Sequence, residues 1–183
     1  MFWVKKFYYF ITNNYLRGLK QFNIAMPLLH VLFLLIFGVL ASFTGFYAGI
    51  FHWAFEKSIF SPFYLLILFV FPSFLEESFF RGFLIPIETA KKGRSSVIKY
   101  TILSSLAFVL WHPVNAFLLN PGARTLFYNP FFLTVVFLLG IFCSLSYIFS
   151  RSLWPAVIIH WIVVVAWVGF LGGRNLVLQN LSF

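Results

Sequence analysis

Five apolar stretches of 18 to 26 residues constrain the fold of this chain more than any other feature. A helix needs about 20 apolar residues to cross the hydrocarbon core of a bilayer. Because a membrane offers no water to hydrogen-bond the backbone, stretches of this length form helices there. The sequence therefore predicts five transmembrane helices, at Met26–Phe51, Pro62–Ile87, Val97–Leu119, Phe131–Ser150 and Trp154–Leu171.

The composition supports this interpretation and extends it to the whole chain. Of its 183 residues, 62% are hydrophobic and only 9% are charged, whereas soluble domains carry roughly 25% charged residues. We therefore expect an all-α, polytopic membrane helical bundle, with residues 1–183 forming a single membrane domain. Residues 1–24 mix aromatic and basic side chains and are predicted to lie at the membrane interface. Residues 62–171 are predicted to form the helical core.

The basic residues predict an orientation. The chain has 13 Lys and Arg against four Asp and Glu, and the basic ones lie between the apolar stretches. That pattern is typical of membrane topology and attraction to anionic lipid, so we expect no nucleic-acid partner. We predict a multi-pass protein of the cytoplasmic (plasma or inner) membrane with a cytoplasmic N-terminus. In that orientation the inner segments hold Lys5, Lys6, Arg17, Lys20, Lys91, Lys92, Arg94, Lys99 and Arg151, and the outer ones Lys57, Arg124 and Arg174.

Two of the four acidic residues, Glu76 and Glu77, are adjacent within the second apolar stretch. One charged residue at the centre of a membrane helix costs roughly 2.5–3.5 kcal/mol, so a purely structural helix has no reason to carry two. Arg81 follows Glu77 by one helical turn and can pair with it. Glu76 then points about 100° away, toward the bundle interior. A structural Glu–Arg clasp accounts for Glu77 and Arg81 but leaves Glu76 unexplained.

Two histidines on other apolar stretches add to this group. His112 lies in the third stretch, directly before Pro113, where we expect the helix to be disturbed. His160 lies within the fifth stretch. Taken alone, each is more often a hydrogen-bonded core residue than a catalyst. Together with the carboxylates, they provide enough groups for a base, an orienting partner and an oxyanion donor.

Three motifs carry a family resemblance. The run Glu76-Glu77-Ser78-Phe79-Phe80-Arg81 resembles the E-E-x-x-x-R motif of the CAAX-protease and bacteriocin-processing (Abi) family of glutamic-type intramembrane endopeptidases. Phe108-Val109-Leu110-Trp111-His112 resembles its F-x-x-x-H motif, and His160 its third motif, H-x-x-x-N. The resemblance implies hydrolysis of a peptide bond by an activated water, with Glu76 as base, His112 as its partner and His160 as an oxyanion donor.

The third motif departs from the family pattern, because Val164 stands where the family has Asn. Loss of one oxyanion donor costs roughly 10²–10³ in rate. Asn115 is a candidate replacement, supplied by the irregular stretch expected after His112, and Glu77, Arg81 and Phe108 are further supporting residues.

His112 lies roughly 24 Å along the third stretch. It reaches the other site residues only if that helix begins in the cytoplasm or tilts strongly.

Alternatives to a protease of this kind remain open. A catalytically inactive scaffold or bacteriocin-immunity protein of the same fold agrees with Val164. Two His and one Glu are also suitable zinc ligands, although H-E-x-x-H spacing is absent and Arg81 disfavours a cation. A transporter with a proton-relay carboxylate is a weaker choice. We expect no cofactor and no metal, with membrane lipid and a membrane-embedded or lipidated peptide or protein substrate as partners.

Overall fold

The structure, a computed structural model, describes Tyr8, residues 10–21 and residues 27–173. These residues form a helical bundle, with one isolated β-bridge between Ala54 and Leu171. Five helices are long and apolar enough to cross a membrane, which confirms the predicted all-α polytopic fold. They are α3 (Pro27–Tyr47), a composite helix over Pro62–Phe83, α6 (Arg94–Leu118), α8 (Pro130–Ser150) and α9 (Leu153–Phe170).

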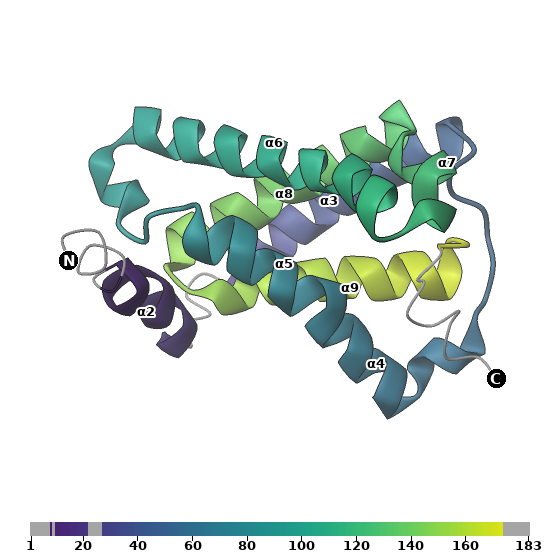
Figure 1. The fold of residues 1–183 in the computed structure, drawn as a ribbon, viewed down its shortest axis with the longest axis horizontal. Helices are drawn as coiled ribbons and strands as arrows, with labels where there is room; N and C mark the ends of the chain where they lie inside the picture. Colours follow the sequence, from purple (N-terminus) through teal and green to yellow (C-terminus); the bar gives the residue numbers. More distant parts are fainter. Residues whose placement is uncertain (1–7, 9, 22–26, 174–183) are drawn as a thin grey trace.

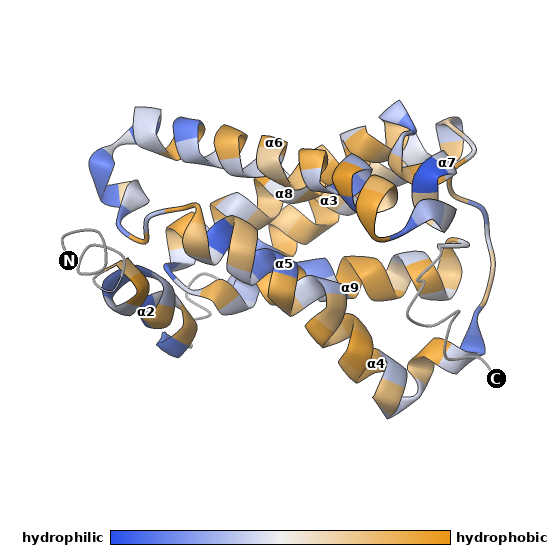
Figure 2. Cartoon of the chain, in the orientation of Figure 1, coloured by the Kyte–Doolittle hydropathy of each residue, from blue (hydrophilic) through white to orange (hydrophobic). Residues whose placement is uncertain are grey.

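The central helix of the bundle is α8. It packs against α3, α6 and α9 (Figure 1), and its inner face includes the fully buried Cys143 and Tyr147. The lipid-facing side of α3 instead exposes large apolar residues such as Val39 and Phe43. Figure 2 shows hydrophilic segments at the two ends of the bundle and, among the apolar helices, at α5. Within the described residues, the charged side chains in the middle of the membrane helices are Glu76, Glu77 and Arg81.

The second membrane helix is broken into four parts: α4 (Pro62–Leu68), η3 (Phe69–Phe74), α5 (Leu75–Glu77) and η4 (Ser78–Phe83). Pro72 lies inside η3, and Phe71 before it has non-helical backbone angles, φ −122° and ψ 109°. Proline lacks an N–H and its ring crowds the preceding turn, so a kink is expected at this point. As a result α4 splays away from α6, while α5 lies within the bundle (Figure 1).

The third membrane helix differs from its prediction at Pro113. We expected the helix to be disturbed after His112, but α6 continues through Pro113 to Leu118, and Asn115 is a helical residue. A proline in a membrane helix removes one backbone hydrogen bond, and neighbouring helices can hold the following turn in place. The α6 helix begins at Arg94, and its first turns are largely exposed. It thus starts beyond the packed part of the bundle, which allows His112 to reach the depth of the other site residues.

The described part of the N-terminal segment closes one end of the bundle. The π-helix η1 (Ile11–Tyr15) and the short α2 (Leu16–Lys20) pack near η4 and α9. Asn14 Nδ2 donates to the carbonyl oxygens of Gly82 (3.0 Å) and Ile85 (3.3 Å). Trp154 Nε1 donates to the Leu19 carbonyl oxygen at 2.9 Å. The remaining residues of the predicted interfacial segment, 1–7, 9 and 22–24, lie outside the described residues.

Candidate active site

A buried ion-pair network links three membrane helices at the level of α5. Arg81 Nη1 donates to Glu77 Oε1 at 2.9 Å, and both side chains are fully buried. Arg81 Nη2 donates to the Gly140 carbonyl oxygen on α8 at 3.1 Å. From α9, His160 Nδ1 lies 2.8 Å from the same Glu77 oxygen. Because an ionised carboxylate only accepts hydrogen bonds, His160 carries a hydrogen on Nδ1. The predicted Glu77–Arg81 pair therefore also orients His160.

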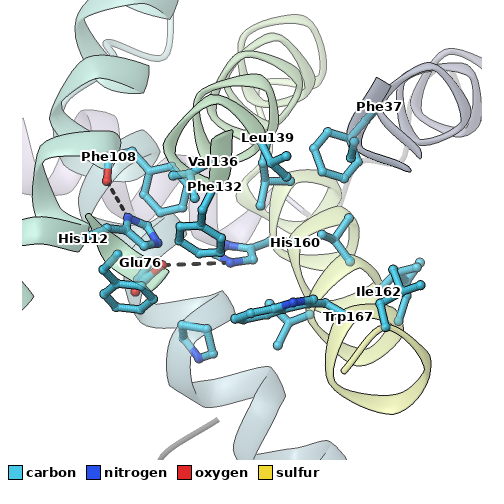
Figure 3. Close-up of a pocket in the computed structure, with 18 of the residues that line it drawn as sticks. Phe37, Glu76, Phe108, His112, Phe132, Val136, Leu139, His160, Ile162 and Trp167 are labelled. Atoms are coloured by element: carbon cyan, nitrogen blue, oxygen red, sulfur yellow. Dashed lines mark hydrogen bonds and ion pairs between the residues drawn. The ribbon is translucent and has the colours of Figure 1, made fainter. Parts of the chain in front are cut away.

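Glu76 faces away from that network and into a cavity. Its side chain is 18% exposed, whereas that of Glu77 is 0% exposed. Trp111 Nε1 donates to Glu76 Oε1 at 3.2 Å. Glu76 Oε2 lies 3.9 Å from His160 Nε2, a separation longer than a hydrogen bond. One oxygen of Glu76 is thus fixed by an indole, and the other faces His160 across open space (Figure 3).

Phe108 holds His112 in place through its backbone and its ring. His112 Nδ1 lies 2.9 Å from the Phe108 carbonyl oxygen, one turn earlier on α6. Since a carbonyl oxygen accepts, Nδ1 carries the hydrogen, and in the neutral ring Nε2 keeps its lone pair. The Phe108 ring packs edge-on against His112 and His160 and lies 4.6 Å beneath the Arg81 guanidinium carbon. The F-x-x-x-H spacing therefore sets the tautomer of His112 as well as its position.

Glu76, His112 and His160 line one cavity with a volume of about 550 Å³. Figure 3 shows their side chains directed into it from three different helices. Its other walls are mostly apolar and come from α3, η3, α8 and α9. Asn115 and Val164 also line it. The position where the family motif has Asn is therefore on the cavity wall, but it carries an isopropyl group that cannot donate a hydrogen bond.

The structure thus brings together Glu76, Glu77, Arg81, Phe108, His112 and His160, with Asn115 on the same cavity. Two contributors were not predicted. Trp111 could have been recognised because a buried indole N–H needs an acceptor. Gly140 could have been recognised because glycine in a membrane helix marks close helix contact. A Cβ added at Gly140 would lie 3.0 Å from the Ser105 side chain, so α6 and α8 are in close contact there.

The arrangement provides a carboxylate and an imidazole lone pair that face the same cavity, with a second imidazole held by a carboxylate nearby. Such a set can accept a proton from water and stabilise developing negative charge. Among the residues that the structure describes, no group of three or more His, Cys, Asp or Glu side chains has the geometry to hold a metal ion.

Comparison with models of known protein families gives a match over more than half of the chain. The family model for type II CAAX prenyl endopeptidase, Rce1-like, matches residues 57–166, which is 110 of the 183 residues. That range begins before α4 and includes all three motifs. No curated protein and no solved structure matches the chain.

Proposed function

The chain belongs to the Rce1-like family of type II CAAX prenyl endopeptidases, and from this membership we propose that it is a glutamic-type intramembrane endopeptidase. In this proposal Glu76 and His112 activate a water molecule that hydrolyses a peptide bond. The catalytic helical core is assigned to residues 62–171. The substrate is a membrane-embedded or lipidated peptide or protein.

The observation that carries the proposal is the different environment of the two adjacent carboxylates. Glu77 is fully buried and is held by Arg81 and His160. Glu76 opens onto the cavity, and the one hydrogen bond to its side chain comes from Trp111. A structural clasp requires one carboxylate for one arginine. The second carboxylate, at a depth where charge is costly, is explained by chemistry in the cavity.

The roles of the imidazoles follow from their tautomers. With Nδ1–H donated to the Phe108 carbonyl, His112 presents Nε2 to accept a hydrogen bond from the attacking water and so to orient it. His160 has Nδ1–H donated to Glu77, so it can donate from Nε2 only as an imidazolium. His160 can then stabilise the oxyanion of the tetrahedral intermediate.

The reaction balances with these groups alone. Glu76 accepts a proton from water, and the resulting hydroxide adds to the peptide carbonyl carbon. The intermediate carries its negative charge on the former carbonyl oxygen, facing His160. The C–N bond then breaks, and protonated Glu76 returns its proton to the leaving amine nitrogen. The products are a carboxylic acid, which releases its proton to water after it leaves the site, and an amine, and the enzyme returns to its initial state.

A second candidate function is a non-catalytic member of the same fold that binds a partner protein, such as a bacteriocin-immunity protein. The observation that favours it is Val164, which lines the cavity where the family motif has a hydrogen-bonding Asn. In such a protein Glu76 would have no proton to transfer. The two candidates therefore make opposite predictions for a change at Glu76.

The test is Glu76→Gln in purified protein, assayed with a library of quenched fluorescent peptides in detergent or lipid vesicles. Glutamine keeps the shape of glutamate but cannot accept the proton. Removal of a general base costs roughly 10²–10⁴ in rate, so cleavage should fall by at least 100-fold while the melting temperature stays within a few degrees. The matched control is Glu56→Gln, which changes an exposed glutamate at one end of the bundle. Full cleavage by Glu76→Gln would overturn the proposed mechanism.

A further inference from the structure

One wall of the cavity that holds Glu76 comes from α3, a helix outside the residues that the family model matches. The match begins at residue 57, after the end of α3. Figure 3 shows Glu76 and His112 on one side of the cavity and Phe37 of α3 on the other, with Leu139 of α8 between them. The candidate catalytic groups and the α3 wall therefore face different parts of a bound substrate.

The α3 wall is apolar and carries no charge. It consists of Leu34, Phe37, Gly38, Ala41 and Ser42, with the Ser42 hydroxyl as its one polar side-chain group. Apart from His160, the lining residues of α8 and α9 are aliphatic or aromatic. A cavity of about 550 Å³ with a mostly apolar lining has the size and chemistry of a ligand pocket. Such a wall accepts a hydrocarbon group, and it disfavours a charged one, which would lose its hydration there.

Gly38 lies in the middle of the α3 wall. Its neighbours on the same helix face are Leu34, four residues before it, and Ala41 and Ser42, three and four residues after it, and all of them line the cavity. A side chain at position 38 would therefore point toward the cavity. A Cβ added at Gly38 would meet no atom within 4 Å, so the space beside this glycine is open.

Helix packing accounts for other glycines of the bundle but not for Gly38. A Cβ added at Gly140 would lie 3.0 Å from the Ser105 side chain, and one added at Gly45 would collide with the Phe51 ring. Those glycines permit close contact between segments. Gly38 permits no such contact, and glycine is less favourable than alanine within a helix. What the missing side chain provides at position 38 is room in the cavity.

We propose that Gly38 is a specificity-determining residue, which sets the size of the hydrocarbon group that a substrate places against α3. This proposal rests on the proposed function, because it concerns the substrate of the same site. The group is either an apolar side chain of the peptide or a hydrocarbon chain attached to the peptide, since both present the same chemistry to this wall. A larger residue at position 38 would occupy the space of the group and exclude large groups before small ones.

Cleavage of graded peptides tests the proposal. One series has alanine, leucine or phenylalanine at a residue flanking the cleaved bond, on each side in turn. A second series has at that residue a cysteine S-alkylated with a methyl, pentyl or decyl group. The quantity measured is the ratio of kcat/KM for the largest member of a series to that for the smallest.

The ratio should fall when the residue at position 38 is enlarged. A difference of one methylene in an apolar pocket changes kcat/KM by roughly 10–200-fold. Gly38→Leu should therefore lower the ratio at least tenfold in the series whose group lies against α3, and Gly38→Ala should lower it by a smaller factor. The series that responds identifies the source of the hydrocarbon group.

The matched control is Val39→Leu, which places leucine at the neighbouring position of the same helix. Val39 is 71% exposed and is not among the residues that line the cavity. This variant should keep the wild-type ratio. If Gly38→Leu leaves both ratios unchanged, or if Val39→Leu lowers them equally, the role of Gly38 is overturned, while the proposed protease function stands because the peptides are cleaved.

A binding measurement separates failure of this proposal from failure of the proposed function. The same peptides, labelled with a fluorophore, are titrated by anisotropy with detergent-solubilised Glu76→Gln protein, with and without Gly38→Leu. The Kd of the largest member should rise at least tenfold more than that of the smallest. If the wild-type protein cleaves none of the peptides, the proposed function fails, and binding alone decides the role of Gly38. Equal changes in Kd across both series, or no binding of any member, would overturn that role.

Discussion

Glu77 and Glu88 are both acidic side chains surrounded by basic ones, but they lie in different environments. Glu88, in the loop after η4, has three partners: Arg17 at 3.0 Å, Lys91 at 2.8 Å and Arg151 at 3.8 Å. Its side chain is 30% exposed. Glu77 has two partners, Arg81 at 2.9 Å and His160 at 2.8 Å, and is fully buried.

The number of ion pairs that a carboxylate makes does not measure their importance for stability. Solvent and salt screen an exposed pair, which contributes little. Removal of one partner of a buried pair leaves an uncompensated charge in a low-dielectric interior. The network around Glu77 also sets the orientation of a candidate catalytic imidazole, while the cluster around Glu88 joins the N-terminal helices to the neighbouring loop. The effects of substitutions at Glu77 and at Glu88 should therefore differ in magnitude and in kind.

The largest effect is expected for Glu77→Gln. The amide keeps the shape but leaves the Arg81 charge unbalanced, which costs roughly 3–5 kcal/mol. For a chain of this size that corresponds to a fall in melting temperature of roughly 6–20 °C. Peptide cleavage should also fall, because His160 loses the carboxylate that fixes the orientation of its ring. Thermal melting in detergent measures the loss of stability. Peptide cleavage, assayed below the melting temperatures of both wild type and Glu77→Gln, measures the loss of activity.

The control for this substitution is the double variant Glu77→Gln with Arg81→Met, which removes both charges. Replacing both partners of a buried pair with well-packed neutral groups is often much less harmful than removing one. The double variant should regain much of the lost melting temperature but not the cleavage activity. If Glu77→Gln melts at the wild-type temperature, the buried network of Glu77, Arg81 and His160 does not contribute the expected stability.

A smaller effect is expected for Arg81→Lys. Lysine keeps the charge near Glu77 but lacks the planar fork of donors, so the hydrogen bond to the Gly140 carbonyl is lost. Contact with the Phe108 ring is weakened as well. A hydrogen bond to a charged group contributes about 1.5–3 kcal/mol, which predicts a fall of roughly 3–12 °C. A melting temperature equal to that of wild type would show that the link to α8 is dispensable.

The sequence predicts the fold well because membrane helices require long apolar stretches, and those are visible without tertiary information. It also predicts the Glu77–Arg81 pair, because a spacing of four residues on one helix fixes which side chains meet. The observed ends of the membrane helices differ from the predicted ends by a few residues. The second helix is less regular than expected, although Pro72 marks the position of its kink.

What the sequence does not reveal depends on contacts between helices. The bond from His160 to Glu77 joins residues 83 positions apart, and that from Trp111 to Glu76 joins residues 35 apart. No periodicity within one helix determines such pairs. The same limit explains the wrong expectation after His112, since the packing that keeps Asn115 helical comes from other helices. Whether Asn115 compensates for Val164 stays a prediction, because its side chain shares the cavity but its role in the reaction is untested.

The smallest effect is expected for Glu88→Gln, and its pH dependence has a definite sign. A hydrogen bond from Lys91, and then attraction to Lys91, Arg151 and Arg17, hold the pKa of Glu88 below its ordinary value of 4.5. A depressed pKa in the folded state means that this carboxylate stabilises the protein above pH 4.5, and that its contribution is lost as the pH falls through the folded-state pKa. Melting curves of wild type and Glu88→Gln should therefore differ slightly at pH 7 and converge as the pH falls below 4.5 and through the lowered pKa of Glu88. Because the cluster is exposed, about 1 M salt should remove the difference at pH 7 as well, whereas the deficit of Glu77→Gln should persist in salt. A Glu88→Gln deficit at pH 7 as large as that of Glu77→Gln would show that the exposed cluster is as important for stability as the buried one.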